Sequence, residues 1–182
     1  MTIPTQRVLR AMLEDTLAAA MEVGECTDAV LAENEEHRAA FWRIREDYPD
    51  CVRRAGPAIS TDTAVPVSAV PAFLARVEQE LAARWPEGRM VAVGHAGDGN
   101  MHVGLLAPEG TPREDWVGRA GEAEAVVNAV AVDLGGTFSA EHGIGQSKRH
   151  AMATHKDPVA LDVMRAVKAA IDPANLMNPG KM

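Results

Sequence analysis

The sequence is poor in cysteine and aromatic residues, and it lacks a long hydrophobic run. Its two cysteines, Cys26 and Cys51, do not form a CxxC pair, a pattern typical of a reduced cytosolic protein rather than of a disulfide scaffold. No apolar segment approaches the roughly 20 residues that span a bilayer. Residues 1–17 are amphipathic and charged, unlike a signal peptide. We therefore expect a cytoplasmic protein without a transmembrane segment.

Positive charge is also scarce. The chain has 18 Lys and Arg against 26 Asp and Glu, and its formal net charge is −8. The basic residues are scattered and aromatic residues make up 4% of the chain, which argues against nucleic acid or an anionic membrane as the main partner. Apolar residues, in contrast, make up 47% of the 182 residues. This composition predicts a folded chain with one core, and we expect a single domain over residues 1–182.

Hydrophobic periodicity predicts an α+β fold. Apolar residues recur at helical spacing over residues 8–21, and a second helical stretch runs over residues 28–44, where "YPDC" should break it. Further on, the pattern reads strand, helix, strand, strand, helix, strand, which is the split βαβ or ferredoxin-like order. It predicts an antiparallel sheet with helices on one face, flanked by N- and C-terminal helices. The elements expected in this unit are a strand at 58–67, a helix that Ser68 could cap, strands at 89–93 and 101–107, a helix at 114–134 and a short strand at 137–140.

Two histidines flank a glycine-rich turn in the stretch "VGHAGDGNMHVGLL" at residues 93–106. His95 is expected to end one strand and His102 to begin the next, so that their imidazoles converge across the turn. Gly97 and Gly99 would let the turn adopt positive φ and approach a ligand closely.

A carboxylate can complete a metal site with these histidines. Glu141, in "SAEHGIGQSK", follows a short strand expected to end at the same edge of the sheet. Two histidines and one carboxylate form a common site for zinc, manganese or iron, with positions left for substrate. Asp98 and Asn100 could hold the turn or support the ligands. Histidines beside glycine turns also serve purely structural roles, so both interpretations stay open.

Other catalytic signatures are weak or missing. "GDGN" lacks dinucleotide-fingerprint spacing, and there is no P-loop, HExxH or GxSxG motif. Neither cysteine lies in a setting typical of a nucleophile. In "FWRIRE", Arg43 and Arg45 either cap a solvated helix end or grip a carboxylate. The last helix should begin near Pro158 and bury Leu161, Met164, Val167 and Ile171.

Several long motifs resemble one family. "GHAGDGNMH", "SAEHGIGQSKR" and "DPANLMNPGKM", together with "FWRIRE" and "DTAVPVSAVPAFL", occur in the order and approximate spacing of the C-terminal region of the FAD-linked oxidases. That family includes D-lactate dehydrogenases, the glycolate oxidase FAD subunit and D-2-hydroxyglutarate dehydrogenase. The resemblance runs from about Leu9 to Met182. It implies the cap, or substrate, domain of a flavin-dependent 2-hydroxy-acid dehydrogenase.

The resemblance also implies a role for individual residues. A divalent metal would bind the substrate hydroxyl, and a general base would take its proton while the flavin accepts the hydride. The matching positions are His95, His102 and Glu141 for the metal, His142 for the base, Arg45 for the substrate carboxylate and Asn178 for the approach to FAD.

Two departures from the family pattern concern the substrate. Hydroxyglutarate-type members carry an asparagine where this chain has Gly104, and a lysine where it has Ser60. A smaller monocarboxylate such as lactate or glycolate is therefore expected.

A further departure concerns the flavin. Nothing here resembles the family's N-terminal FAD-binding domain, so we expect FAD to be bound mainly by a partner domain or subunit. Self-association of the chain is the alternative to such a partner. We expect the chain alone to be inactive. Two other functions stay open, namely a non-catalytic module that binds a metal or a hydroxy acid, and a small metal-dependent hydrolase.

Overall fold

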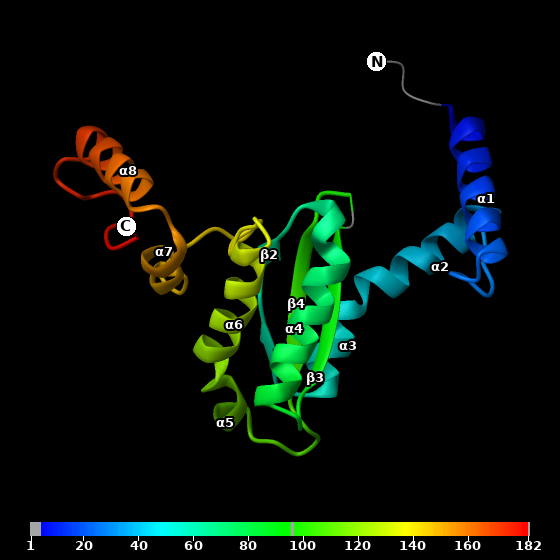
Figure 1. The fold of residues 1–182 in the computed structure, drawn as a ribbon, viewed down its shortest axis with the longest axis horizontal. Helices are drawn as coiled ribbons and strands as arrows, with labels where there is room; N and C mark the ends of the chain where they lie inside the picture. Colours follow the sequence, from blue (N-terminus) through cyan, green and yellow to red (C-terminus); the bar gives the residue numbers. More distant parts are fainter. Residues whose placement is uncertain (1–4, 96, 182) are drawn as a thin grey trace. The chain divides into compact units, whose positions relative to one another are not determined.

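The computed structural model describes residues 5–95 and 97–181, and it divides into two compact units. The first unit is Met1–Tyr48 and the second is Pro49–Met182 (Figure 1). Within the described ranges, no helix combines the length and the apolar character needed to cross a membrane.

The first unit is helical. It contains α1 (Gln6–Glu22) and α2 (Glu35–Glu46). The predicted helix at 28–44 begins seven residues late, because Asn34 caps α2 by accepting a hydrogen bond from the His37 N–H at 2.9 Å. The expected break is present, since α2 ends at Glu46, but "YPDC" itself is helical and begins a separate helix, α3 (Tyr48–Ala55). Pro49 lies in the first turn of α3, where a missing N–H costs little.

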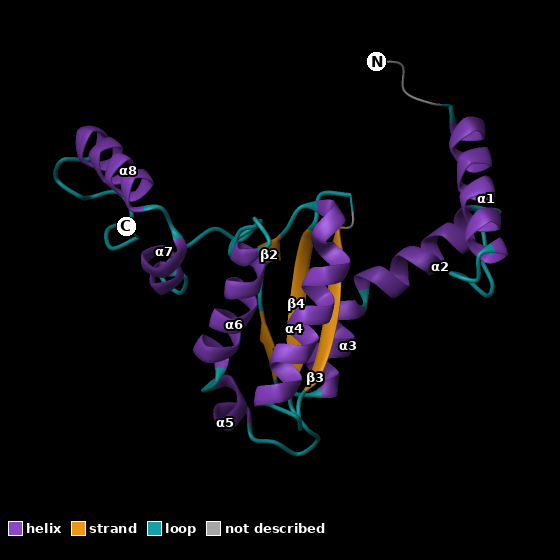
Figure 2. Cartoon of the chain, in the orientation of Figure 1, coloured by secondary structure: helices purple, strands orange, loops and turns teal. Residues whose placement is uncertain are grey.

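An antiparallel sheet forms the centre of the second unit. Its strands are β1 (Ala58–Ser60), β2 (Thr63–Ala64), β3 (Arg89–His95) and β4 (Asn100–Leu106). β4 is central, with β3 on one side and β1 and β2 on the other (Figure 2). The strand predicted at 58–67 is thus two short strands in a single register.

The split βαβ order is present, although its last strand is minimal. The strand predicted at 137–140 is reduced to one antiparallel bridge, in which Thr137 and Ala64 exchange hydrogen bonds of 2.7 and 3.0 Å. Because Gly136 and Gly135 end the preceding helix directly before this bridge, the chain returns along the edge of β2 and turns away at once. The α+β prediction, with an antiparallel sheet, is confirmed.

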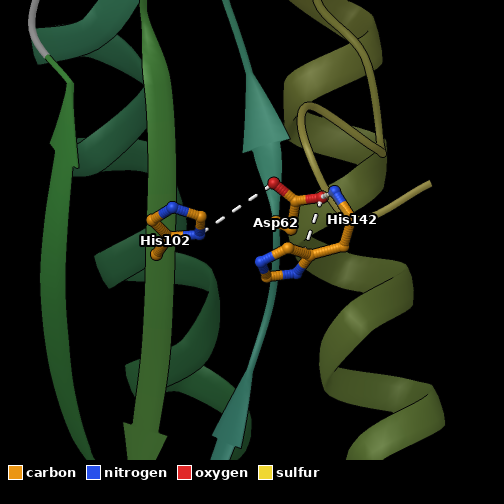
Figure 3. Close-up of side chains that lie close together, drawn as sticks. All are labelled: Asp62, His102 and His142. Carbon is orange, nitrogen blue, oxygen red and sulfur yellow. Dashed lines mark hydrogen bonds and ion pairs between the residues drawn. The ribbon is translucent and has the colours of Figure 1, made fainter. Parts of the chain in front are cut away.

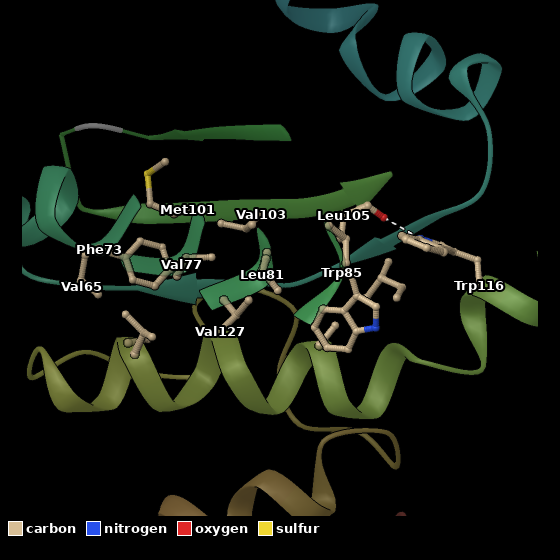
Figure 4. Packing of buried hydrophobic residues seen from close by; sticks show 14 of the residues in the cluster. Val65, Phe73, Val77, Leu81, Trp85, Met101, Val103, Leu105, Trp116 and Val127 are labelled. Carbon is tan, nitrogen blue, oxygen red and sulfur yellow. Dashed lines mark hydrogen bonds between the residues drawn. The ribbon is translucent and has the colours of Figure 1, made fainter. Parts of the chain in front are cut away.

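Two helices pack against one face of the sheet, α4 (Val70–Arg84) and α6 (Ala120–Asp133). Alternation along β4 directs its odd-numbered residues into this core (Figure 4). Ser68 does not cap α4, because it lies inside a 3-10 turn, η1 (Val67–Ala69). The buried apolar side chains of the core include Phe73, Val77, Leu81, Trp85, Met101, Val103, Leu105, Trp116 and Val127.

The predicted helix at 114–134 is two helices. α5 (Arg113–Val117) ends at Gly118, and α6 begins at Ala120. α5 places the buried Trp116 so that its indole N–H donates to the Leu105 carbonyl of β4 at 2.9 Å. The break therefore provides a tertiary hydrogen bond that a continuous helix would forgo.

The C-terminal segment contains α7 (Arg149–His155), which the sequence pattern did not predict, and α8 (Pro158–Ile171), which it did. Asp157 caps α8 by accepting from the Ala160 N–H at 2.9 Å, and Pro158 lies in the first turn as expected. The expected burial along α8 is wrong, since none of its residues is buried: Leu161 and Met164 are half-buried, and Val167 and Ile171 are 53% and 68% exposed.

Candidate metal centre

His95 and His102 lie on the face of the sheet opposite α4 and α6. Val93 pairs with His102 and His95 pairs with Asn100, so both histidines alternate away from the core. Their ring centroids are 6.3 Å apart in an edge-on arrangement. The predicted convergence of the two imidazoles is therefore confirmed.

The turn between them depends on one glycine and one aspartate. Gly99 has a φ of +76°, and a Cβ there would lie 1.9 Å from the Val65 carbonyl oxygen. The φ expected for Gly97 depends on Ala96, which lies outside the described residues. The Asp98 carboxylate accepts from the Asn100 N–H at 3.0 Å, which closes the turn. The buried side-chain amide of Asn100, in contrast to its backbone N–H, makes no hydrogen bond with the described residues.

Glu141 reaches both histidines. One carboxylate oxygen lies 3.7 Å from Nε2 of His95, and the other lies 3.8 Å from Nε2 of His102. Glu141 follows the Thr137–Ala64 bridge, which brings this segment to the sheet edge as predicted. The structure thus brings together the three residues expected to bind a metal.

The donor atoms fit a divalent cation. Each of the three residues offers one ligand atom, and these atoms lie within 4.8 Å of one another. Tetrahedral zinc with ligands at about 2.0–2.2 Å separates its donors by about 3.3–3.6 Å. The measured distances of 3.7 and 3.8 Å are close to that separation. Two imidazoles and a carboxylate suit zinc, manganese or iron.

His142 lies beside the same cluster. Its ring stacks on His102 with centroids 5.4 Å apart, and its Nδ1 is 3.8 Å from the Asp62 carboxylate (Figure 3). The Asp62 carboxylate is also 3.9 Å from Nδ1 of His102. Asp62, His102 and His142 therefore form a second group whose atoms could surround a cation.

Hydrogen bonding makes the second group the weaker ligand set. The Asp62 carboxylate accepts from the N–H groups of Ala140, Glu141 and His142 and from the Lys148 ammonium. Burial raises the pKa of Asp62, but the His142 N–H and Lys148 outweigh that effect and hold the pKa below its ordinary value. Because its lone pairs are occupied, Asp62 is a poor metal ligand.

Asp62 and Lys148 were not among the site residues expected from the sequence. Asp62 lies between β1 and β2, and its side chain is 1% exposed. A charged residue inside an apolar strand pattern is a signal that could have identified it. Lys148 occurs in the quoted "GIGQSKR" motif, but only the fold brings it to Asp62.

Two of the expected site residues are not among the residues that form this cluster. Arg45 is on α2 in the first unit. Asn178 lies after α8 in the second unit, with a φ of +48°, and lines an apolar pocket with Val163, Val167 and Met177. The roles expected for Arg45 and Asn178 stay predictions.

The fold and the cluster define an α+β domain with a candidate metal site on the face of its sheet opposite α4 and α6. The family described as "FAD linked oxidases, C-terminal domain" matches residues 2–182. The chain therefore belongs to this family, as the motifs predicted.

Curated relatives carry names of 2-hydroxy-acid enzymes. A D-2-hydroxyglutarate dehydrogenase of Stutzerimonas stutzeri is 32% identical over 92% of this chain and 36% of its own length. A probable mitochondrial D-lactate dehydrogenase of Danio rerio is 38% identical over 86% of this chain and 31% of its own length. The glycolate oxidase subunit GlcD of Escherichia coli is 37% identical over 85% of this chain and 30% of its own length. The chain thus spans about a third of the length of the curated relatives it matches.

Proposed function

We propose that the chain is the metal- and substrate-binding part of an FAD-dependent 2-hydroxy-acid dehydrogenase or oxidase. The observation that carries this proposal is the convergence of His95, His102 and Glu141, with donor atoms within 4.8 Å of one another, in a chain of the FAD-linked oxidase family. These three residues would hold a divalent cation, whose chemistry is Lewis-acid stabilisation of an alkoxide.

His142 is the residue we assign to proton transfer. Its side chain is 64% exposed and stacks on a metal-ligand histidine, so it borders the space where a substrate would lie. Its Nδ1 lies 3.8 Å from the Asp62 carboxylate, and an imidazole so placed is suited to take a proton from a substrate hydroxyl. We assign Arg45 to the substrate carboxylate, because a guanidinium binds a carboxylate with two parallel hydrogen bonds.

The surface beside the cluster supports a small monocarboxylate as substrate. Ser60 and Gly104 pair directly across β1 and β4, on the same face as His102 and two residues further from the turn. Neither side chain carries a charge that could bind a second carboxylate. A lactate- or glycolate-like acid therefore suits this surface better than a dicarboxylate.

We propose that FAD is bound mainly by a partner domain or subunit, and that Asn178 contributes to its site. The flavin, when bound, supplies the oxidant. Large apolar side chains on α8 and after it are exposed, among them Val159, Val163, Ile171 and Leu176, and such a surface favours a partner.

Metal content of the purified chain tests the proposal. After incubation with zinc or manganese and removal of excess ion, we expect about one metal per chain. His95→Ala and Glu141→Ala should lose it while circular dichroism stays unchanged. His150→Ala is the matched control, because His150 is exposed and outside both ligand groups. A wild-type chain that takes up neither metal would refute the proposed site.

A further inference from the structure

The segment that carries Glu141 and His142 is held by one carboxylate. After the bridge at Thr137, residues 138–142 belong to no helix or strand. The N–H groups of Ala140, Glu141 and His142 all donate to Asp62, at 3.2, 3.2 and 2.9 Å. Three successive peptide groups are therefore tied to a residue of the sheet.

Lys148 donates hydrogen bonds both to Asp62 and to the same segment. The Lys148 ammonium donates to the Asp62 carboxylate at 3.2 Å, to the Phe138 carbonyl at 3.2 Å and to the Ser139 hydroxyl at 3.3 Å. It also donates to the Asp62 carbonyl at 3.3 Å. The lysine and aspartate side chains are 15% and 1% exposed. Each charge thus compensates the other away from water.

The position of Asp62 explains why this matters for the metal site. The pairs Ser60–Gly104 and Thr63–Met101 belong to one register, which places Asp62 opposite His102. Asp62, whose carboxylate holds the Glu141 backbone, therefore lies directly beside β4, the strand that carries His102. The Glu141 side chain is 48% exposed and makes no hydrogen bond with the described residues, so the position of its backbone limits what its carboxylate can reach.

We propose that Asp62 and Lys148 form a pair of positioning residues that hold residues 138–142 so that Glu141 reaches His95 and His102. This inference rests on the proposed metal site. Fixing the backbone before binding reduces the entropy lost when the carboxylate is ordered, and groups that orient metal ligands typically change affinity about 10–100-fold when removed.

Hydrogen exchange in the metal-free full chain tests the first half of the inference. In Lys148→Met, the amides of Ala140, Glu141 and His142 should exchange at least about tenfold faster, because the uncompensated Asp62 carboxylate draws in water. The Val103 amide in β4 is the internal reference, and its unchanged protection shows that the fold is intact. Lys148→Arg keeps the charge and should retain most of the protection.

Metal affinity tests the second half. Zinc affinity measured by competition should fall about 10–100-fold in Lys148→Met and recover partly in Lys148→Arg. Lys156→Met is the control, since that lysine is exposed and its side chain makes no bond with the described residues. Faster exchange with unchanged affinity, or unchanged exchange, would overturn the inference. Absence of zinc binding in the wild type would instead overturn the proposed metal site, and exchange would still decide whether the pair holds the segment.

Discussion

His102 and His142 stack with their ring centroids 5.4 Å apart, although one lies in a central strand and the other follows a single bridge at the sheet edge. His102 belongs to both groups that could surround a cation, whereas His142 belongs to one. The stack therefore places His142, to which we assign proton transfer, beside the candidate metal site without making it one of the three ligands that we assign.

Substitution of the two stacked histidines should separate ligand from neighbour. In His102→Asn, zinc affinity should fall by more than the roughly 100-fold typical of outer-shell residues, because a ligand is lost. In His142→Asn, about one zinc per chain should remain. Competition with a chromophoric chelator measures both. Loss of zinc in His142→Asn together with retention in His95→Asn would instead assign the metal to Asp62, His102 and His142.

The glycine turn should resist a single methyl group. In Gly99→Ala, the new Cβ would meet the Val65 carbonyl oxygen at 1.9 Å, and the residue would keep a φ of +76°. We expect the free energy of unfolding to fall by more than about 1 kcal/mol. Urea denaturation followed by circular dichroism measures it. Gly97→Ala is the matched control, with nothing within 4 Å of its Cβ, and its stability should change by less than about 0.5 kcal/mol.

The indole of Trp116 should stabilise the core through its hydrogen bond as well as its size. Trp116→Phe keeps an aromatic ring but removes the donor to the Leu105 carbonyl. Stability should fall by about 1–3 kcal/mol, the range for a buried group left without its partner. Trp42→Phe, at a 54% exposed position of α2, should cost less than about 0.5 kcal/mol. Equal losses in the two variants would contradict this assignment.

The C-terminal tail should respond to acid through Asp172. The Lys168 ammonium lowers the pKa of Asp172, burial opposes it, and the N–H groups of Leu176 and Met177 add to the lowering. Because the folded pKa lies below the ordinary value of 3.8, the stabilisation is complete above that pH and is lost as the pH falls through the folded pKa.

Amide chemical shifts of Leu176 and Met177 measure this transition. Their inflection should lie below pH 3.8 in the wild type and move upward in Lys168→Ala. Asp172→Asn should remove it. An inflection at or above the ordinary value in the wild-type chain would show that the ammonium does not stabilise the carboxylate.

Local sequence was sufficient for the parts of this protein governed by short-range physics. The α+β order, the glycine turn, the start of α8 at Pro158 and the candidate ligands His95, His102 and Glu141 follow from periodicity, turn chemistry and motif spacing. Local sequence patterns gave wrong boundaries or burial where contacts with other segments decide the structure. The strand at 58–67 is divided, α6 begins after a break that positions Trp116, and α8 leaves Val167 and Ile171 exposed.

Tertiary structure alone decided how the site is held. Asp62 and Lys148 are far apart in the chain, and no local pattern pairs them. They meet because antiparallel pairing places Asp62 opposite His102 and the Thr137–Ala64 bridge returns the later segment to that strand. A buried carboxylate needs donors and a compensating charge, and the fold supplies both from residues 140–148. The sequence by itself determined which residues are candidate ligands, and packing determined how they are positioned.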